Sequence, residues 1–296
     1  MNKRIFVPLI IILICLVITQ TVAYIAAMPF NPTLGYLAIY TISIQWIAFL
    51  YAGGIIFGNE RTEKYYDLMG SITFISTLLL SIYLSPRALS TRQIILSIFV
   101  AIWTLRLGSF LFYRIHNNGG IDSRFTEIKK NNYRFLMVWT LQGVWVFLTL
   151  LPVLILNQST KRIQLNLLDY CGFLLWIIGF MFEAVADYQK FTFRSMPENK
   201  GNFISCGVWA YSRHPNYFGE ILLWLGVAIS SFSGSKSYSV FISPIFVALL
   251  LIFVSGIPAL EKKADQLYAN NEEYQLYKKN TPVLIPFIGR KGSANF

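Results

Sequence analysis

The stretch Tyr211–Glu220 reads YSRHPNYFGE and is followed directly by the apolar run ILLWLGVAIS. Such polar and charged side chains are costly near lipid unless they have partners or hold a ligand. Pro215 fits the first turn of a helix, which would place Arg213 and His214 at the helix entrance. Free backbone N–H groups at a helix start, together with cationic side chains, form an anion site. The stretch therefore predicts a site for a phosphate-bearing or carboxylate-bearing ligand.

Further ionisable residues lie near the ends of other apolar runs. Glu183 and Asp187, in EAVADYQK, are four residues apart and would face one direction on a helix. Together with Asp67, Arg106 and Glu220 they make five ionisable groups from four apolar runs. Charges in such positions usually turn toward the interior of a helical bundle, where they pair or line a cavity. We therefore expect them to share one polar site.

Each of these residues also has a simpler explanation when taken alone. Asp67 suits the first turn of a helix, where the backbone dipole favours a carboxylate. Arg106 has a side chain long enough to reach the membrane surface, and the Glu183–Asp187 pair would be solvated at a helix end. His214 by itself is weak evidence. The prediction of a site therefore depends on the grouping of residue types rather than on any single residue.

The composition places these residues in an integral membrane protein. Of the 296 residues, 55% are hydrophobic and only 13% are charged, whereas a soluble domain of this size carries more charge. The three cysteines, Cys15, Cys171 and Cys206, have no metal-type or disulfide-type spacing. No GxGxxG motif follows a strand pattern, which excludes a Rossmann cofactor domain. Any nucleotide would therefore bind among helices.

Eight apolar runs are long enough to cross a bilayer, which takes roughly 20 residues of helix. They predict an all-α, polytopic bundle of seven or eight transmembrane helices, the seventh being the shortest. No repeat or long linker divides the chain, so we predict a single membrane domain over residues 1–296. The predicted spans are Ile5–Ala27, Leu34–Phe57, Tyr66–Leu84, Gln93–Tyr113, Phe135–Leu156, Leu167–Tyr188, Tyr217–Phe232 and Val240–Leu260.

Basic residues are unevenly divided between the two sides that eight spans define. Nineteen Lys and Arg residues lie on the side of the two termini and five on the other, while Arg106 falls inside a span. The positive-inside rule then places both termini in the cytoplasm. The same division explains most of the net charge of +11, so a nucleic-acid partner is not required. The first span has an alternative as a signal peptide, because Lys3 and Arg4 precede it, but its apolar run is long for that role.

Four segments resemble, in this order, the C-terminal half of the steroid 5-alpha-reductase family, most closely its bacterial branch of uncharacterised membrane proteins. The segments are EAVADYQKFTFRS, GVWAYSRHPNYFGEILLWLG, SGIPALEKK and NTPVLIPFI. The resemblance is good over 167–288, looser over 65–75 and 102–115, and absent before residue 60. The combination of the ExxxD span with the other segments is more specific than RHPNYxGE alone.

The resemblance implies a membrane enzyme that uses NADPH to reduce a carbon–carbon double bond conjugated to a ketone in a lipophilic, steroid-like or isoprenoid-like substrate. Hydride would go to the β carbon while an acidic group polarises the carbonyl. No metal is implied, and the protein would lie in a bacterial inner membrane. The catalytic groups that we expect are Asp67, Glu220 and Tyr66, where Tyr66, or Tyr113 as an alternative, would replace the family tyrosine that holds the substrate ketone. The implied NADPH-binding residues are Arg106, Glu183, Asp187, Arg194, Arg213, His214, Asn216 and Tyr217.

The sequence departs from the family at one substrate position. The family tyrosine that holds the substrate ketone is replaced by Trp103, whose indole cannot donate as a phenol does, and Asp67 is the nearest counterpart of the family glutamate. Two other hypotheses remain. A membrane methyltransferase of the isoprenylcysteine type also has an RHPxYxG-like element and would use S-adenosylmethionine, although such enzymes are generally shorter and lack the ExxxD span. The other is a lipid-binding or transport protein, but no paired broken helices support transport.

Overall fold

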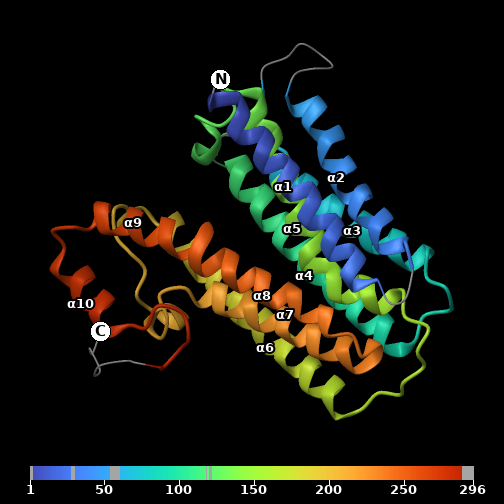
Figure 1. Ribbon diagram of the computed structural model, residues 1–296. Coiled ribbons are helices and arrows are strands. Elements are labelled where there is room, and N and C mark those ends of the chain that lie inside the picture. Colours follow the sequence, from blue (N-terminus) through green and yellow to red (C-terminus); the bar gives the residue numbers. More distant parts are fainter. Residues whose placement is uncertain (1–2, 28–30, 54–60, 118, 120–121, 289–296) are drawn as a thin grey trace. The chain divides into compact units, whose positions relative to one another are not determined.

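The computed structural model describes residues 3–27, 31–53, 61–117, 119 and 122–288 (Figure 1). Over these ranges the regular elements are helices and no strand is present. Among the described residues, eight helices are long and apolar enough to cross a membrane. The predicted all-α, polytopic membrane bundle is therefore confirmed. The predicted end of the second span, Phe57, lies outside the described residues.

The chain folds into two compact units. The first unit comprises Met1–Asp169 and Ser230–Ser243, and the second comprises Tyr170–Ile229 and Pro244–Phe296. The chain passes from one unit to the other within helices rather than in linkers. For this reason we still propose a single membrane domain over residues 1–296. The three helices that carry these passages are α6 (Leu167–Ser195), α7 (Pro215–Ser235) and α8 (Ile242–Leu249).

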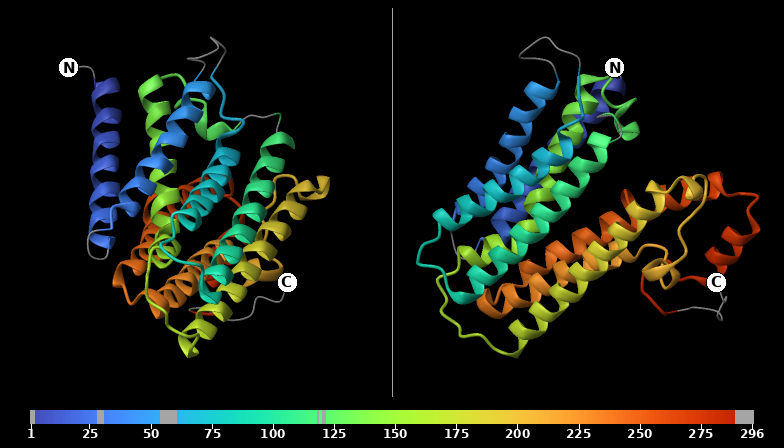
Figure 2. Two further views of the ribbon diagram at one scale, coloured as in Figure 1. Left: turned by 90° about the vertical axis from the view of Figure 1, so that its right-hand side faces the viewer. Right: turned by 180° about the vertical axis from the view of Figure 1, so that it is seen from behind.

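Helix α5 (Asn132–Asn157) is the central helix of the first unit. In its most apolar stretch 83% of the residues are buried within the structure, against 22% for α1. Hydropathy alone does not explain this position, because α1 is more apolar than α5 and stays exposed. Helix α5 is buried because other helices of the first unit pack against it. Figure 2 shows its neighbours running alongside it. The long helices of the first unit that contact α5 include α1 (Lys3–Ala26), α2 (Thr33–Ala52), α3 (Tyr66–Tyr83) and α4 (Thr91–Asn117).

The outer helices of the first unit expose apolar side chains. Leu13 and Val17 of α1, Leu79 of α3 and Leu105 of α4 are each more than half exposed. In water such surfaces would promote association, whereas in a bilayer they contact acyl chains. The exposed faces of α1, α3 and α4 are therefore the faces turned toward lipid.

Glycines allow α6 and α7 to approach closely in the second unit, where Figure 1 shows the two helices side by side. A Cβ atom at Gly219 would lie 2.5 Å from the Gly179 carbonyl oxygen and 2.6 Å from the Glu183 backbone nitrogen. At Gly226 it would lie 2.4 Å from the Gly172 carbonyl oxygen. Small residues at such crossings are typical of membrane helices. The close approach brings Glu183 of α6 against the start of α7.

We expect Gly219→Ala to destabilise the protein, because the added methyl group must push two helix backbones apart. Overpacking of this kind costs about 1–3 kcal/mol, and the free energy of unfolding in an SDS titration of mixed micelles should fall by that amount. Gly35→Ala is the matched control, since a Cβ at Gly35 would lie 3.6 Å from Gln20 Oε1, which is an ordinary contact. Equal stability of the two variants would contradict the close approach.

The eighth predicted span, Val240–Leu260, is broken rather than one regular helix. The break lies at Gly256, whose backbone is not helical (φ −93°, ψ −99°), and a side chain would not fit there because a Cβ would lie 2.4 Å from the Leu251 carbonyl oxygen. Pro258 suits the first turn of the helix that follows. The chain after the break is more polar and forms two short helices. In order, the elements are η5 (Tyr238–Phe241), α8, the π-helical turn η6 (Leu250–Val254), α9 (Ile257–Leu267) and α10 (Glu272–Asn280).

Candidate functional site

The segment Tyr211–Glu220 forms the entrance of a helix, as its composition predicts. Pro215 is the first residue of α7, and Arg213 and His214 immediately precede it. Proline is favoured at this position because it has no N–H to leave unpaired and its φ is already helical. The first two turns of α7 carry Asn216, Tyr217 and Glu220.

The C-terminal stretch of the described chain pairs with this entrance. The Ser212 hydroxyl donates to the Leu284 carbonyl oxygen at 2.7 Å, and the Arg213 backbone N–H donates to the Pro282 carbonyl oxygen at 2.9 Å. Two segments that the sequence distinguishes separately, YSRHPNYFGE and NTPVLIPFI, therefore lie side by side in the second unit. Their pairing fixes the backbone from which His214 projects.

Glu261 of α9 is the carboxylate around which the entrance is organised. His214 Nε2 lies 2.8 Å from Glu261 Oε1. Arg213 Nη1 and Lys278 Nζ lie 3.2 Å and 3.9 Å from the other carboxylate oxygen, Oε2. Lys278 also forms an ion pair with Asp265. With His214 neutral, the two cations and two carboxylates balance, so the arrangement is electrically satisfied without a ligand.

Burial lowers the pKa of His214 below its usual value, and it outweighs the hydrogen bond and the charge of Glu261, which raise it. The ring is therefore neutral at pH 7, so Nε2–H donates to Glu261 and Nδ1 is left as an acceptor. Among the residues that the structure describes, neither His214 Nδ1 nor Arg213 Nε has a hydrogen-bond partner. The His214 ring stacks on Tyr217 with 5.6 Å between ring centroids. Two buried polar atoms at the entrance thus remain for a ligand.

We expect the protein to lose stability as the pH falls below about 6.5, the ordinary pKa of histidine. Because folding lowers the pKa of His214, the unfolded chain binds more protons in this window, and stability there rises with pH. The thermal unfolding midpoint, measured from about pH 7.5 to about pH 5, should fall more steeply for the wild type than for His214→Asn. His116→Asn removes an exposed histidine and should keep the wild-type slope. An unchanged slope in His214→Asn would contradict a buried neutral imidazole.

Asp187 and Asn216 are brought together by α6 and α7. Asn216 Nδ2 donates to Asp187 Oδ1 at 3.2 Å. Glu183, one turn before Asp187, is buried, with 2% of its surface exposed. Glu220 follows Asn216 by four residues, which places it on the same side of α7. The carboxylates of Glu183, Asp187 and Glu220 therefore belong to the region where the two helices meet.

The cationic end of α6 lies beyond the predicted span. That span ended at Tyr188, which would leave Lys190 and Arg194 in a loop, but α6 continues to Ser195 and carries both. Lys190 Nζ lies 4.6 Å from the centroid of the Trp209 ring, and Arg194 is exposed. Cations in the last turns of a helix are favoured by its dipole. Both residues therefore have a structural role in addition to any ligand contact.

Asp67 and Arg106 belong to the first unit. Asp67 lies in the first turn of α3, and its Oδ2 lies 3.7 Å from Arg124 Nη2 and 3.9 Å from Arg114 Nη2. The dipole-favoured position and the ion pairs together explain why a carboxylate is stable there. Arg106 is half-buried in α4. Whether these residues share one site with the residues of the second unit stays a prediction.

Tyr66 and Trp103 contribute to the packing of the first unit. The Tyr66 hydroxyl donates to the Val138 carbonyl oxygen at 2.8 Å, and its ring packs edge-on against Trp139, with centroids 5.0 Å apart. Trp103 is 1% exposed and packs edge-on against Phe74, with centroids 5.3 Å apart. The Tyr66 proton is therefore engaged by the bundle in this structure. Its catalytic role stays a prediction.

Comparison with known proteins gives one family match. The family described as "Protein of unknown function (DUF1295)" matches residues 55–281. This range includes Asp67 and Arg106 as well as the whole entrance of α7 and α9. No solved structure matches the chain.

Several curated proteins are similar to parts of the chain. The 3-oxo-5-alpha-steroid 4-dehydrogenase 1 of Rattus norvegicus is 28% identical over 117 residues, which is 40% of this chain and 40% of the relative. An uncharacterized protein of Schizosaccharomyces pombe is 21% identical over 213 residues, 63% of this chain and 62% of its own length. A probable O-methyltransferase of Ustilaginoidea virens is 30% identical over 76 residues, 26% of each chain. The match thus spans less than half the length of the steroid dehydrogenase.

Proposed function

The chain belongs to the family described as "Protein of unknown function (DUF1295)", and from this premise we propose that it is a membrane-embedded oxidoreductase. Specifically, it reduces a carbon–carbon double bond conjugated to a ketone in a lipophilic, steroid-like or isoprenoid-like substrate, with NADPH as donor. The likeness to a steroid 4-dehydrogenase supports the reaction class. The observation that carries the proposal is the entrance of α7, where Arg213, His214 and Asn216 are held in place by carboxylates of neighbouring helices.

The residues at the entrance of α7 suit a nucleotide. His214 Nδ1 offers a buried acceptor and Arg213 Nε a buried donor, neither of which has a partner among the described residues. Arg194 is exposed, and a guanidinium binds phosphate oxygens in pairs. We assign the binding of NADPH to Arg106, Glu183, Asp187, Arg194, Arg213, His214, Asn216 and Tyr217.

In the proposed reaction the double bond gains a hydride at the β carbon and a proton at the α carbon, which leaves a saturated ketone. NADPH, when bound, supplies the hydride and is oxidised to NADP⁺. Glu220, half-buried on the Asn216 side of α7, is the proposed acid that holds a proton toward the substrate carbonyl. Asp67 and Tyr66 are further proposed acids. To serve in this way, Tyr66 would have to exchange its hydrogen bond to the Val138 carbonyl for one to the substrate.

We further propose a bacterial inner-membrane location with both termini in the cytoplasm. The excess of Lys and Arg on the side of the termini supports this orientation. Cationic loops on that side would raise the local concentration of a phosphate-bearing cofactor. The lipophilic substrate would enter from the bilayer.

Equilibrium binding of NADPH and of S-adenosylmethionine to the purified protein tests the proposal. We expect NADPH to bind and S-adenosylmethionine not to bind, and we expect NADPH absorbance to fall when a 3-oxo-4-ene steroid is added as a probe substrate. If NADPH binds but the probe is not turned over, the assignment of NADPH as cofactor stands and that steroid is excluded as a substrate. Binding of S-adenosylmethionine alone would overturn the reductase proposal.

A membrane methyltransferase of the isoprenylcysteine type is the second candidate. The similarity to a probable O-methyltransferase over 76 residues favours it, as does the RHPNYFG stretch at the entrance of α7. The Asp187–Asn216 contact argues against it, because Asp187 belongs to the ExxxD motif, which such enzymes lack. The two-cofactor binding experiment distinguishes the candidates.

A further inference from the structure

A cavity of about 500 Å³ lies at the end of the first unit where α1 ends and α2 begins. Pro86, which lines it, follows the end of α3, whereas Asp67 lies in the first turn of that helix. An 18-residue helix is about 27 Å long, so the cavity and Asp67 lie at opposite ends of the first unit. The cavity is therefore separate from the residues of the first unit proposed for catalysis.

The walls of the cavity differ in polarity. Ala26, Leu34 and Ile155, at the ends of membrane-spanning helices, form an apolar wall, and the loop after α5 adds three polar residues, Ser159, Thr160 and Lys161. The ends of spanning helices lie at the depth of lipid headgroups. A ligand at this depth that combines an apolar body with a polar end is a membrane lipid.

The loops around the cavity carry positive charge only. The described residues that border it, 27, 31–32, 84–90 and 158–166, include no Asp or Glu. The nearest carboxylate in the sequence, Asp169, is bound by Arg92, with 2.6 Å between Asp169 Oδ1 and Arg92 Nε. The positive charge at this end of the first unit, around the cavity, is therefore complementary to an anion. The basic side chains of these loops and of the residue after α7 are Arg87, Lys161, Arg162 and Lys236.

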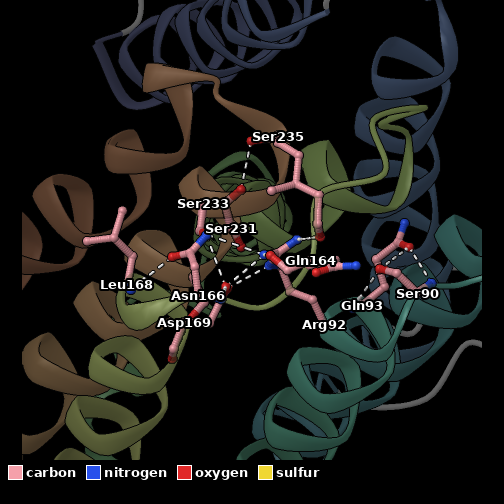
Figure 3. Close-up of polar contacts among 12 residues, drawn as sticks. Ser90, Arg92, Gln93, Gln164, Asn166, Leu168, Asp169, Ser231, Ser233 and Ser235 are labelled. Atoms are coloured by element: carbon pink, nitrogen blue, oxygen red, sulfur yellow. Dashed lines mark hydrogen bonds and ion pairs between the residues drawn. The ribbon is translucent and has the colours of Figure 1, made fainter.

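The wall that carries Lys161 is fixed in place before any ligand binds. Arg92 donates to the carbonyl oxygens of Ile163 and Gln164, each at 3.0 Å, and Figure 3 shows it reaching Asp169 and Gln164 together. Lys161 Nζ donates to the Ser235 carbonyl oxygen at 2.8 Å. An ammonium has three N–H groups, so two remain for a ligand. A site formed in advance loses little entropy on binding.

We propose that this cavity binds the anionic, phosphate-bearing headgroup of a membrane phospholipid. The Lys161 ammonium and the Ser159 and Thr160 hydroxyls contact the phosphate, while the apolar wall receives the glycerol backbone and the first acyl methylenes. The site is independent of the proposed reductase activity and of NADPH.

Native mass spectrometry of the delipidated protein, titrated with phosphatidylglycerol, tests this proposal. Lys161→Gln should weaken retention of the lipid about fivefold, and Lys161→Arg, which keeps the charge, should restore it. Lys236→Gln is the matched control, because it removes the same charge from a residue that does not line the cavity, and should change retention less than about twofold. Equal weakening by Lys161→Gln and Lys236→Gln would overturn the proposal.

Three further experiments test the identity of the ligand and the location of its site. Phosphatidylcholine, whose headgroup has no net charge, should be retained less than phosphatidylglycerol, and equal retention would overturn the assignment to an anionic headgroup. Ala27→Trp, which fills the cavity, should abolish selective retention. Inorganic phosphate at the concentration of the lipid should not compete, and effective competition would assign the site to a free anion instead.

Discussion

Arg92→Ala is expected to lower the free energy of unfolding by about 3–5 kcal/mol. The Arg92 guanidinium is 3% exposed and holds Asp169, which is 0% exposed, through both carboxylate oxygens, at 2.6 Å and 2.7 Å. Removing the guanidinium would leave a buried carboxylate without its cation and two loop carbonyl oxygens without their donor. Removing only one partner of a buried ion pair is strongly destabilising because the remaining charge is uncompensated. Denaturation by SDS in mixed micelles measures the change.

Two variants make this prediction specific. Arg92→Lys should recover only part of the loss, because an ammonium cannot reproduce the paired contacts of a guanidinium. Arg87→Ala removes an exposed arginine from the same end of the first unit and should leave the free energy of unfolding unchanged. If Arg92→Ala were no less stable than Arg87→Ala, the ion pair would not contribute to folding.

The sequence was sufficient to predict the number and type of the spans. Within lipid every backbone polar group must be satisfied inside the structure, so a long apolar run can only be a helix. The helix ends were less predictable. Helix α6 was predicted to end at Tyr188 and ends at Ser195, because a helix that continues into water no longer differs from a loop in hydropathy. The break at Gly256 was missed because the residues on both sides of it are apolar.

The candidate site was predictable where its residues are close in the sequence. The entrance of α7 was expected from YSRHPNYFGE alone. The role of Glu261 was not expected, although Glu261 lies in SGIPALEKK. A carboxylate after an apolar run usually indicates a solvated helix end. The Arg92–Asp169 pair is not predictable for a related reason: Arg92 precedes the predicted span Gln93–Tyr113, where a basic residue usually indicates a solvated loop. These contacts depend on which helices become neighbours, and no local pattern of a single sequence contains that information.

Substitution of Glu261 tests whether the entrance of α7 takes part in the proposed reaction. It lies on α9, whereas the side chains that it holds, Arg213 and His214, precede α7. If these two side chains contact a nucleotide, Glu261 acts on that nucleotide only through them. It is a positioning residue in the proposed enzyme, and its removal should change geometry and charge at the entrance of α7 while leaving α6 and α7 packed.

Glu261→Gln is therefore expected to reduce turnover of NADPH with the probe steroid about a hundredfold, because a displacement of about 1 Å in a positioned group can cost that factor. The exposed Glu273 gives the matched control, Glu273→Gln, which should retain wild-type turnover. The pKa of His214, measured by NMR, gives a readout that does not depend on activity. Because the Glu261 charge raises this pKa, it should fall further in Glu261→Gln. A pKa that rose or stayed constant would show that Glu261 does not hold His214, and wild-type turnover in Glu261→Gln would remove the entrance of α7 from the proposed reaction.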